Sequence, residues 1–259
     1  MKLKLCIIFF IAFIGCAGWS LWTDTSKPAR TDFTVSQTQD TSWWSAPLEP
    51  LRQKAYPYLH FQDAMKAKLK PLPMYVSIRS IPKTVQNAVI ATEDKRFYDH
   101  GAIDLIGIIR ATAVNLYSGE TLQGGSTISQ QVVKNVFLSQ ERTWSRKGQE
   151  IVLAFLLEHY YSKEEILEIY LNTAYFGANA TGIYEASQTY YNNKPDELRL
   201  SQAAMLAGLL QAPTYYNPLE NYDAARARQK IVLTLLAEQG YISAGQAASA
   251  YKEPLHLER

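Results

Sequence analysis

The apolar positions of this chain recur with the period of an amphipathic helix over most of its length, and hairpin signals are nearly absent. Between residues 82 and 93, Val85, Ala88 and Val89 share one face, Pro82 marks the start and Glu93 falls near the end. Similar patterns predict helices over residues 104–118, 126–136, 146–161, 162–172, 201–210, 223–238 and 243–251. We therefore expect one mostly α main domain, with loops near residues 122–125 and 177–182.

Three of the predicted helices begin at residues that are typical N-caps. Asp104 and Ser126 each stand just before an apolar-periodic run. Ser162 and Glu165 have the three-residue spacing of a capping box, in which each side chain satisfies a backbone N–H at the start of the helix.

The first residues form the strongest apolar segment of the sequence. Lys2 and Lys4 precede an uncharged stretch, residues 5–22, that is long enough to cross a bilayer. The charges favour a cytoplasmic tip at residues 1–4 and a body on the outside. A cleaved signal peptide and a lipoprotein signal ending at Cys16 are the alternatives. Residues 23–71 are then expected to form a juxtamembrane stalk that leads into a main domain over residues 72–259.

Composition and charge narrow the classes of partner. The net charge is +2 in 259 residues, so there is no bulk electrostatic case for binding nucleic acid. Cys6 and Cys16 are the only cysteines and both lie in the apolar segment, which excludes a disulfide framework from the main domain. Four scattered histidines argue against a zinc site. We predict no metal site and no required cofactor, and the sequence leaves open a need for a divalent cation.

Polar clusters interrupt the helical pattern at four places. The first contains Glu93 and His100, and the second, "QGGSTISQQVVKN", sets two glycines before a helix start. The other two are "ERTWSRKGQE" and "SKEEILEIYLN". Two carboxylates beside several cations fit glycosyl chemistry on a phosphate-bearing ligand. Solvated surface charges explain each cation separately, and helical ion pairs with Arg146 and Lys147 explain Glu150.

Taken together, "EDKRFYDH", "GGSTISQQVVKN", "RKGQE", "SKEEILEIYLNTAYFG" and "LSQAAMLAGLLQAPTYYNP" resemble the ordered motifs of the peptidoglycan glycosyltransferases, glycosyltransferase family 51. The resemblance covers residues 72–240. Gly101 directly follows His100, whereas the family usually places one residue between them. Because the sequence ends at Arg259, it resembles the monofunctional transglycosylases, which lack the transpeptidase domain of bifunctional penicillin-binding proteins.

The resemblance implies a lysozyme-like lobe, a small membrane-facing lobe and an N-terminal transmembrane helix. It implies that Glu93 is the base for the acceptor hydroxyl and that Glu150 assists departure of the pyrophosphate. The implied substrate-binding residues are Ser126, Thr127, Gln130, Gln131, Lys134, Arg142, Arg146, Lys147 and Lys163. The implied supporting residues are Asp94, Phe97, His100, Gly124, Gly125 and Asn172.

The implied reaction is the polymerisation of lipid II into β-1,4-linked glycan, with inversion and release of undecaprenyl pyrophosphate. Its expected partners are lipid II, the growing lipid-linked glycan, the membrane and other cell-wall synthesis proteins, on the extracytoplasmic side of a bacterial inner membrane. Two alternatives remain: a lysozyme-like enzyme that cleaves glycan, and an inactive scaffold for wall synthesis. The cation clusters favour glycan synthesis, because an enzyme that cleaves glycan does not need to bind pyrophosphate.

Overall fold

The computed structural model describes residues 48–118, 124–138 and 143–258. These residues form a helical body, and the described part contains no strand beyond an isolated antiparallel bridge between Tyr175 and Thr181. The prediction of a mostly α main domain is therefore confirmed. The predicted transmembrane segment, residues 5–22, lies outside the described residues.

The helices occupy most of the described chain. They are α2 (Leu48–Leu59), α3 (Phe61–Leu69), α4 (Lys83–Glu93), α5 (Leu105–Ser118), α6 (Ile128–Phe137), α7 (Trp144–Tyr160), α8 (Lys163–Thr173), α9 (Ile183–Tyr191), α10 (Leu200–Leu209), α11 (Tyr222–Glu238) and α12 (Ala244–Lys252). Two short 3₁₀ helices, η1 (Ile78–Ser80) and η2 (Pro195–Glu197), lie in the connections.

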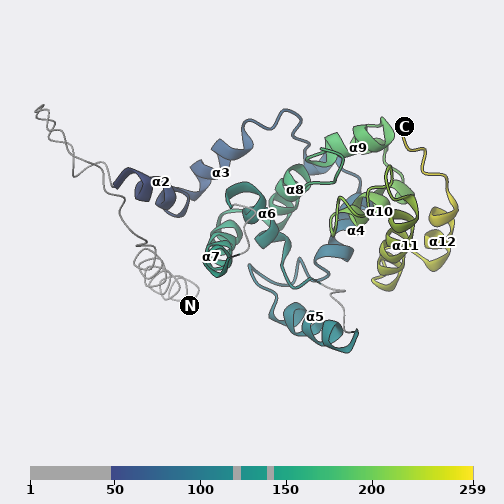
Figure 1. The fold of residues 1–259 in the computed structure, drawn as a ribbon, viewed down its shortest axis with the longest axis horizontal. Helices are drawn as coiled ribbons and strands as arrows, with labels where there is room; N and C mark the ends of the chain where they lie inside the picture. Colours follow the sequence, from purple (N-terminus) through teal and green to yellow (C-terminus); the bar gives the residue numbers. More distant parts are fainter. Residues whose placement is uncertain (1–47, 119–123, 139–142, 259) are drawn as a thin grey trace, which may run out of the picture.

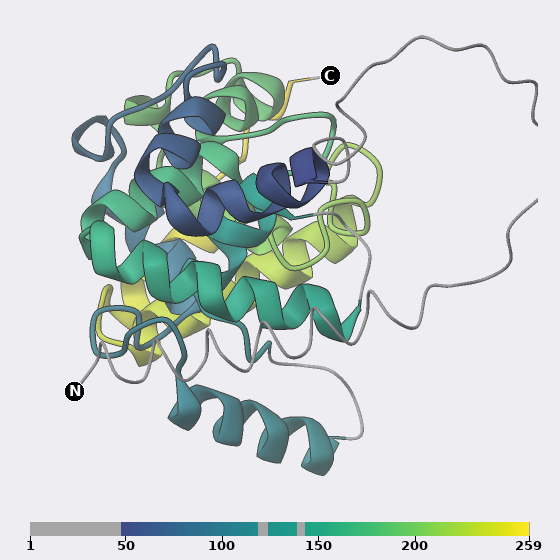
Figure 2. The same ribbon diagram turned by 90° about the vertical axis from the view of Figure 1, so that its left-hand side faces the viewer.

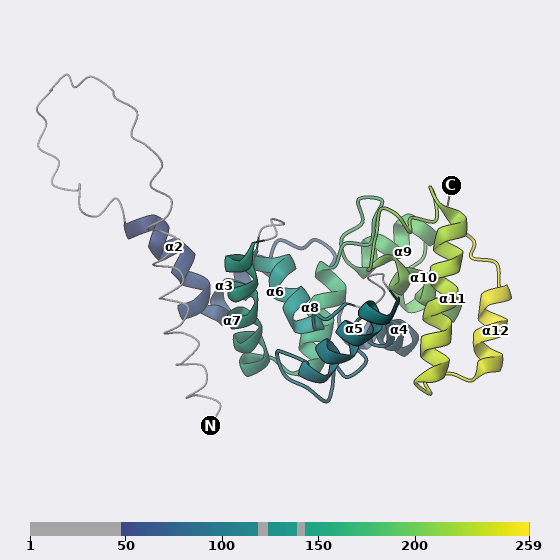
Figure 3. The same ribbon diagram turned by 60° about the horizontal axis from the view of Figure 1, so that its bottom comes forward.

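Two groups of helices make up the body. In one, α6 packs against α7 and α8; in the other, α4 packs against α10 and α11, with α12 against α11 (Figure 1). Figure 3 shows α2 and α3 at one end of the molecule and α11 and α12 at the other. Helix α10 lies at the centre of the second group, and its residues 201–209 are all buried. A single apolar core runs through both groups.

The folded chain begins earlier than the predicted boundary at residue 72. Phe61 and Met65 on α3 are buried in the same core as α4. Their i, i+4 spacing places both side chains on one face of a short helix. Helices α2 and α3 were not predicted, because polar residues and Pro57 obscure the apolar period there.

The capping predictions have mixed outcomes. Ser162 and Glu165 form the predicted capping box at α8. The prediction of Ser126 as an N-cap is wrong by one residue, because Thr127 caps α6 and completes a capping box with Gln130. Ser126 is thereby left just before the helix, where it lines a pocket and its hydroxyl accepts a hydrogen bond from Lys147.

The connection into α4 is clamped to α8 by side chains. Asn172 accepts a hydrogen bond from the Val76 backbone N–H at 2.7 Å and donates one to the Val76 carbonyl at 2.8 Å. Glu168 accepts from the Ile78 N–H at 2.7 Å. These hydrogen bonds hold the extended segment before α4 against α8.

The predicted loop over residues 177–182 is confirmed. Gly177 and Gly182 both have positive φ, at +85° and +87°. A Cβ at Gly182 would lie 2.8 Å from the Asn172 carbonyl oxygen, so only glycine fits there. The loop therefore closes tightly over the end of α8.

Helix α5 stands apart from the rest of the body, as Figure 2 shows. Its apolar side chains are unusually exposed: Leu105 at 69%, Ile109 at 70% and Leu116 at 80%. Large exposed apolar patches mark binding surfaces for protein, ligand or membrane. Within the described ranges, no helix has both the length and the apolar content needed to cross a bilayer.

Candidate active site

Glu93 is the last residue of α4, where the chain leaves the helix. The Gln131 side-chain amide on α6 donates a hydrogen bond to Glu93 Oε2 at 2.9 Å. The amide oxygen of Gln131 in turn accepts from the hydroxyl of Tyr170 on α8 at 3.2 Å. Glu93 is therefore held by a chain of neutral hydrogen-bond donors, and no described residue forms a direct ion pair with it.

The surroundings of Glu93 favour retention of its proton. Burial raises the pKa of the Glu93 carboxyl, the Gln131 hydrogen bond and the positive charges of Arg228 and Lys134 lower it, and Asp94 raises it further. The net pKa lies above the ordinary value for glutamate. A carboxylate with a raised pKa is a stronger base, which suits it to accept a proton from a sugar hydroxyl.

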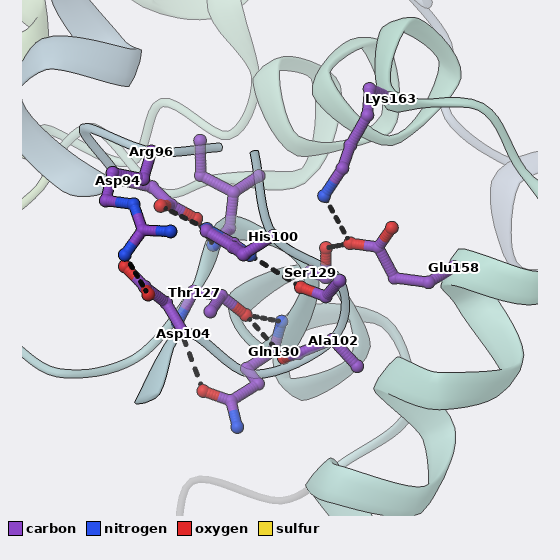
Figure 4. A network of polar contacts seen from close by, with 12 residues as sticks. Asp94, Arg96, His100, Ala102, Asp104, Thr127, Ser129, Gln130, Glu158 and Lys163 are labelled. Atoms are coloured by element: carbon purple, nitrogen blue, oxygen red, sulfur yellow. Dashed lines mark hydrogen bonds and ion pairs between the residues drawn. The ribbon is translucent and has the colours of Figure 1, made fainter. Parts of the chain in front are cut away.

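A polar turn directly after Glu93 fixes its position (Figure 4). Asp94 Oδ1 contacts His100 Nε2 at 2.6 Å, and Asp94 Oδ2 accepts from the Ile128 backbone N–H at 3.0 Å. The Thr127 hydroxyl donates to the Ala102 carbonyl at 2.9 Å. The turn is thus tied to the first residues of α6, as expected for residues that support the site.

His100 is surrounded by acceptors on both ring nitrogens. Nδ1 lies 2.6 Å from the Gly101 carbonyl oxygen, and Nε2 faces the Asp94 carboxylate. A carbonyl and a carboxylate are acceptors, so the two contacts together favour the doubly protonated imidazolium. Burial lowers the pKa of His100, but the Asp94 and Gly101 hydrogen bonds outweigh it, and the net pKa is raised.

Phe97 is buried beneath this turn. The ammonium of Lys163 lies 4.5 Å from the centroid of the Phe97 ring and 2.7 Å from Glu158 Oε1. The Ser129 hydroxyl also donates to Glu158. In Figure 4, Lys163 therefore belongs to an ion-paired network that joins α6, α7 and α8.

A pocket of about 190 Å³ lies between α6 and α7. It is lined by the predicted site residues Ser126, Gln130, Gln131, Lys134, Arg146, Lys147 and Glu150. Gln131 lines this pocket and also bonds Glu93, so the pocket and the Glu93 carboxyl share a wall. The structure thus brings together most of the residues that the sequence proposed for substrate binding.

Glu150 is buried at one wall of the pocket, with 3% of its side chain exposed. Arg146 donates to Glu150 Oε2 at 3.0 Å, and Lys147 donates to Glu150 Oε1. Lys147 also donates to the Ser126 hydroxyl at 3.2 Å. The buried Arg146 Nε has no hydrogen-bond partner among the described residues, so it remains a donor for a bound anion.

Lys134 lies between the two acids. Its positive charge interacts with both Glu150 and Glu93, while burial lowers the pKa of its ammonium group. Lys134 is half-buried and forms no ion pair among the described residues. Burying an unpaired charge costs folding free energy, and an anionic ligand would offset that cost. Lys134 therefore lies between Glu93 and the other cations of the pocket.

The remaining predicted residues lie elsewhere. Lys163 is outside the lining of this pocket, and Asn172 clamps the segment before α4. A Cβ at Gly124 would meet no described atom within 4 Å, and one at Gly125 would make ordinary contact with Ile108. Gly124 therefore borders open space just before α6, whereas Gly125 lies against Ile108. Arg142 lies outside the described residues.

Sequence reasoning missed two residues near Glu93. Tyr170 is fully buried in α8 and positions Gln131. Arg228 on α11 places a positive charge near Glu93, from a helix 135 positions later in the chain. In the sequence, the position of Arg228 next to Gln229, which is buried in α11, was only a weak indication of this role.

Asp94, His100 and Asp104 have ligand-type atoms within 4.8 Å of one another. Each residue already has a protein partner, because Asp94 bonds His100 and Ile128, and Asp104 Oδ1 lies 3.3 Å from Arg96 Nη1. The cluster is explained as the hydrogen-bonded network of the turn.

Comparison with known proteins assigns the family. The family model described as "Transglycosylase" matches residues 65–237. The chain belongs to the transglycosylase family. The motifs in the sequence predicted this family.

Several known proteins are similar to this chain. Penicillin-binding protein 1A of Neisseria flavescens is 46% identical over 185 residues, which are 71% of this chain and 23% of that protein. This chain thus spans about a quarter of the length of that penicillin-binding protein. A Cupriavidus necator protein named as a transglycosylase is 45% identical over 195 residues, 75% of this chain and 84% of that one. The solved structure of penicillin-binding protein 1A from Haemophilus influenzae aligns with a TM-score of 0.45 and 24% identity, over 72% of this chain and 18% of that one.

Proposed function

We propose that this transglycosylase polymerises lipid II into β-1,4-linked peptidoglycan strands at the outer face of the inner membrane. The observation that carries the proposal is the arrangement around Lys134. On one side of it lies the proton-accepting Glu93, which forms no direct ion pair with any residue that the structure describes, and on the other lies a pocket lined with cations. Sugar activation and pyrophosphate binding need these two features together.

The reaction follows from the two features. Glu93 removes the proton from the 4-hydroxyl of the acceptor sugar as its oxygen attacks the anomeric carbon of the donor. The bond from that carbon to the lipid pyrophosphate breaks, and the electron pair leaves with the pyrophosphate. A single displacement inverts an α-linked donor to a β-linked product. Lys134, Arg146 and Lys147 stabilise the negative charge that develops on the leaving group.

Glu150 has a different task in this mechanism. Its two carboxylate oxygens are engaged by Arg146 and Lys147. It offsets the mutual repulsion of these cations and fixes their side chains at the pocket wall. We propose that Glu150 assists departure of the pyrophosphate through the cations that it orients.

The apolar face of α5 supports a membrane-bound substrate. Ile106 and Ile109 are 59% and 70% exposed on a helix that stands off the body. A polyprenyl tail stays in lipid, so the active site must sit at the bilayer surface. We propose that α5 forms the small membrane-facing lobe, that the rest is the lysozyme-like lobe, and that residues 5–22 are a single-pass anchor. Other cell-wall synthesis proteins are the proposed partners in the cell.

The test is to incubate the purified full chain in detergent with lipid II and, separately, with preformed glycan. The proposal predicts polymer and released undecaprenyl pyrophosphate from the first and no shortening of the second. Shortened glycan without polymer from lipid II would instead identify a glycan-cleaving enzyme. A parallel reaction with a chelator tests the proposal that no cofactor is required, which predicts that polymer still forms.

A further inference from the structure

We propose that Arg228 is a positioning residue for the reaction: its guanidinium, delivered from α11, favours the ionised form of the Glu93 carboxyl. This inference rests on the proposed function, in which Glu93 is the base. It assigns a role to a C-terminal helix that lies outside the pocket lining described above.

The packing of three helices places Arg228 and Glu93 in the same part of the body. Helices α10 and α11 both pack against α4, whose last residue is Glu93. The Arg228 side chain crosses α10 at Gly208, where an added Cβ would lie 3.0 Å from Arg228 Cγ. Gln239, at the end of α11, donates to the Ala91 carbonyl of α4 at 3.0 Å and locks the two helices together. The glycine thus makes room for the aliphatic stem of the arginine.

Among the described residues, no ion pair neutralises the charge of Arg228. Its buried Nε has no hydrogen-bond partner in the described part of the chain, and its guanidinium lies 5.9 Å from the centroid of the Tyr216 ring. Burial lowers the pKa of Arg228, while the negative charge of Glu93 raises it. A half-buried guanidinium with an unmatched donor carries a cost that a role in the site would explain.

Arg228 differs from the other groups that face Glu93. Gln131 and Tyr170 are neutral at physiological pH, and Asp94 has the same charge as Glu93. Lys134 is positive, but it interacts more strongly with Glu150 than with Glu93. Arg228 is the other cation near the base, and Glu93 is the largest favourable charge in its own surroundings.

The consequence concerns the protonation state of the base. Burial favours the neutral carboxylic acid, which cannot accept a proton. A fixed positive charge favours the carboxylate, so it preserves the fraction of enzyme that can react near neutral pH. Removing the charge of Arg228 should therefore raise the pKa of Glu93 further and shift the acid limb of the rate profile to higher pH.

The experiment compares Arg228→Met, which keeps much of the apolar stem, with Arg228→Lys, which keeps the charge. Lys230→Met is the matched control, because it removes an exposed positive charge from the same helix. For each full-length protein we would measure thermal unfolding, kcat and KM for lipid II across pH, and the titration of the Glu93 carboxyl by ¹³C NMR.

We expect Arg228→Met to lower kcat roughly tenfold near pH 6.5, with little change in KM and recovery as the pH rises. Arg228→Lys should keep most of the activity, and Lys230→Met should match the wild type. An equal loss at every pH, or no change in the Glu93 titration, would show that Arg228 only packs. If wild-type protein made no polymer, the proposed function would fail, while the Glu93 titration in Arg228→Met would still decide the electrostatic claim.

Discussion

Glu93 and Glu150 both interact with Lys134, yet their immediate surroundings are opposite. The hydrogen bond to Glu93 comes from the neutral amide of Gln131, and burial dominates its pKa. Glu150 is bonded directly by Arg146 and Lys147, and only 3% of its side chain is exposed. The first arrangement leaves a carboxyl that can exchange a proton, and the second leaves a carboxylate that organises cations.

The comparison separates two kinds of residue that look alike in a sequence. Both acids lie in charged, motif-rich stretches, and both are buried or partly buried. A group suited to proton transfer is one whose charge is left partly unsatisfied, and that costs stability. A group suited to organisation is one whose charge is fully matched. Substitution of Glu93 should therefore lower activity more than stability, whereas substitution of Glu150 should lower stability more than activity.

The largest effect is expected from Glu93→Gln. The amide keeps the shape and can accept the hydrogen bond from Gln131, but it cannot take a proton. We expect polymerisation of lipid II to fall by about 10²–10⁴-fold. Because the folded pKa of Glu93 is raised, its ionised form is disfavoured in the native state at high pH. The variant should therefore match or exceed the wild-type melting temperature at pH 8, and a clear loss of stability there would contradict this account.

The next effect is expected from Lys134→Met, which removes the cation between the two acids. Loss of one group that stabilises the leaving pyrophosphate should lower kcat/KM for lipid II by about 10²-fold. Lys134→Arg should recover part of the loss. Lys68→Met, at an exposed position on α3, is the control for a change of net charge. Similar losses in Lys134→Met and Lys68→Met would exclude a local role.

Glu150→Gln should show the opposite balance to Glu93→Gln. It leaves Arg146 and Lys147 without a charged partner, and we expect the free energy of unfolding to fall by about 1–3 kcal/mol. Activity should fall by roughly tenfold, since the cations remain but are held less firmly. Denaturant unfolding and initial rates on the same samples would measure both. A loss of activity as large as that of Glu93→Gln would mean that Glu150 also transfers a proton.

The smallest effect is expected from His100→Asn, and it should depend on pH. The folded pKa of His100 is raised, so its stabilisation is fully present below the unfolded pKa, about 6.5. It is lost as the pH rises through the folded value. We expect the variant to be less stable by about 1 kcal/mol at pH 5.5, with a smaller difference at pH 9. A difference that grew with pH would mean that the ring is neutral in the folded protein.

Local signals in the sequence were enough for much of the fold. The apolar period located α4 and α7, and the spacing of Ser162 and Glu165 located the start of α8. Helix α9 was missed, because its start depends on Gly182, which has no side chain to act as a cap. Ser126 and Thr127 are both good caps, and only the three-residue spacing to Gln130 distinguishes them.

The site was less accessible to sequence reasoning, because it depends on contacts between distant helices. The i, i+4 spacing predicts the pair of Arg146 and Glu150, and the structure contains it. No spacing indicates that Gln131 bonds Glu93 or that Arg228 lies near it. The role of Asn172 was similarly hidden, because its partner is the backbone of Val76, 96 residues earlier.

The most direct test of the division between the two acids is the pH dependence of kcat for wild type and Glu150→Gln, measured with saturating lipid II. The account predicts that both proteins have an acid limb at the same pH, above the ordinary range for glutamate, because the limb belongs to Glu93. A limb that disappeared or shifted strongly in Glu150→Gln would assign the reacting proton to Glu150 and contradict the account.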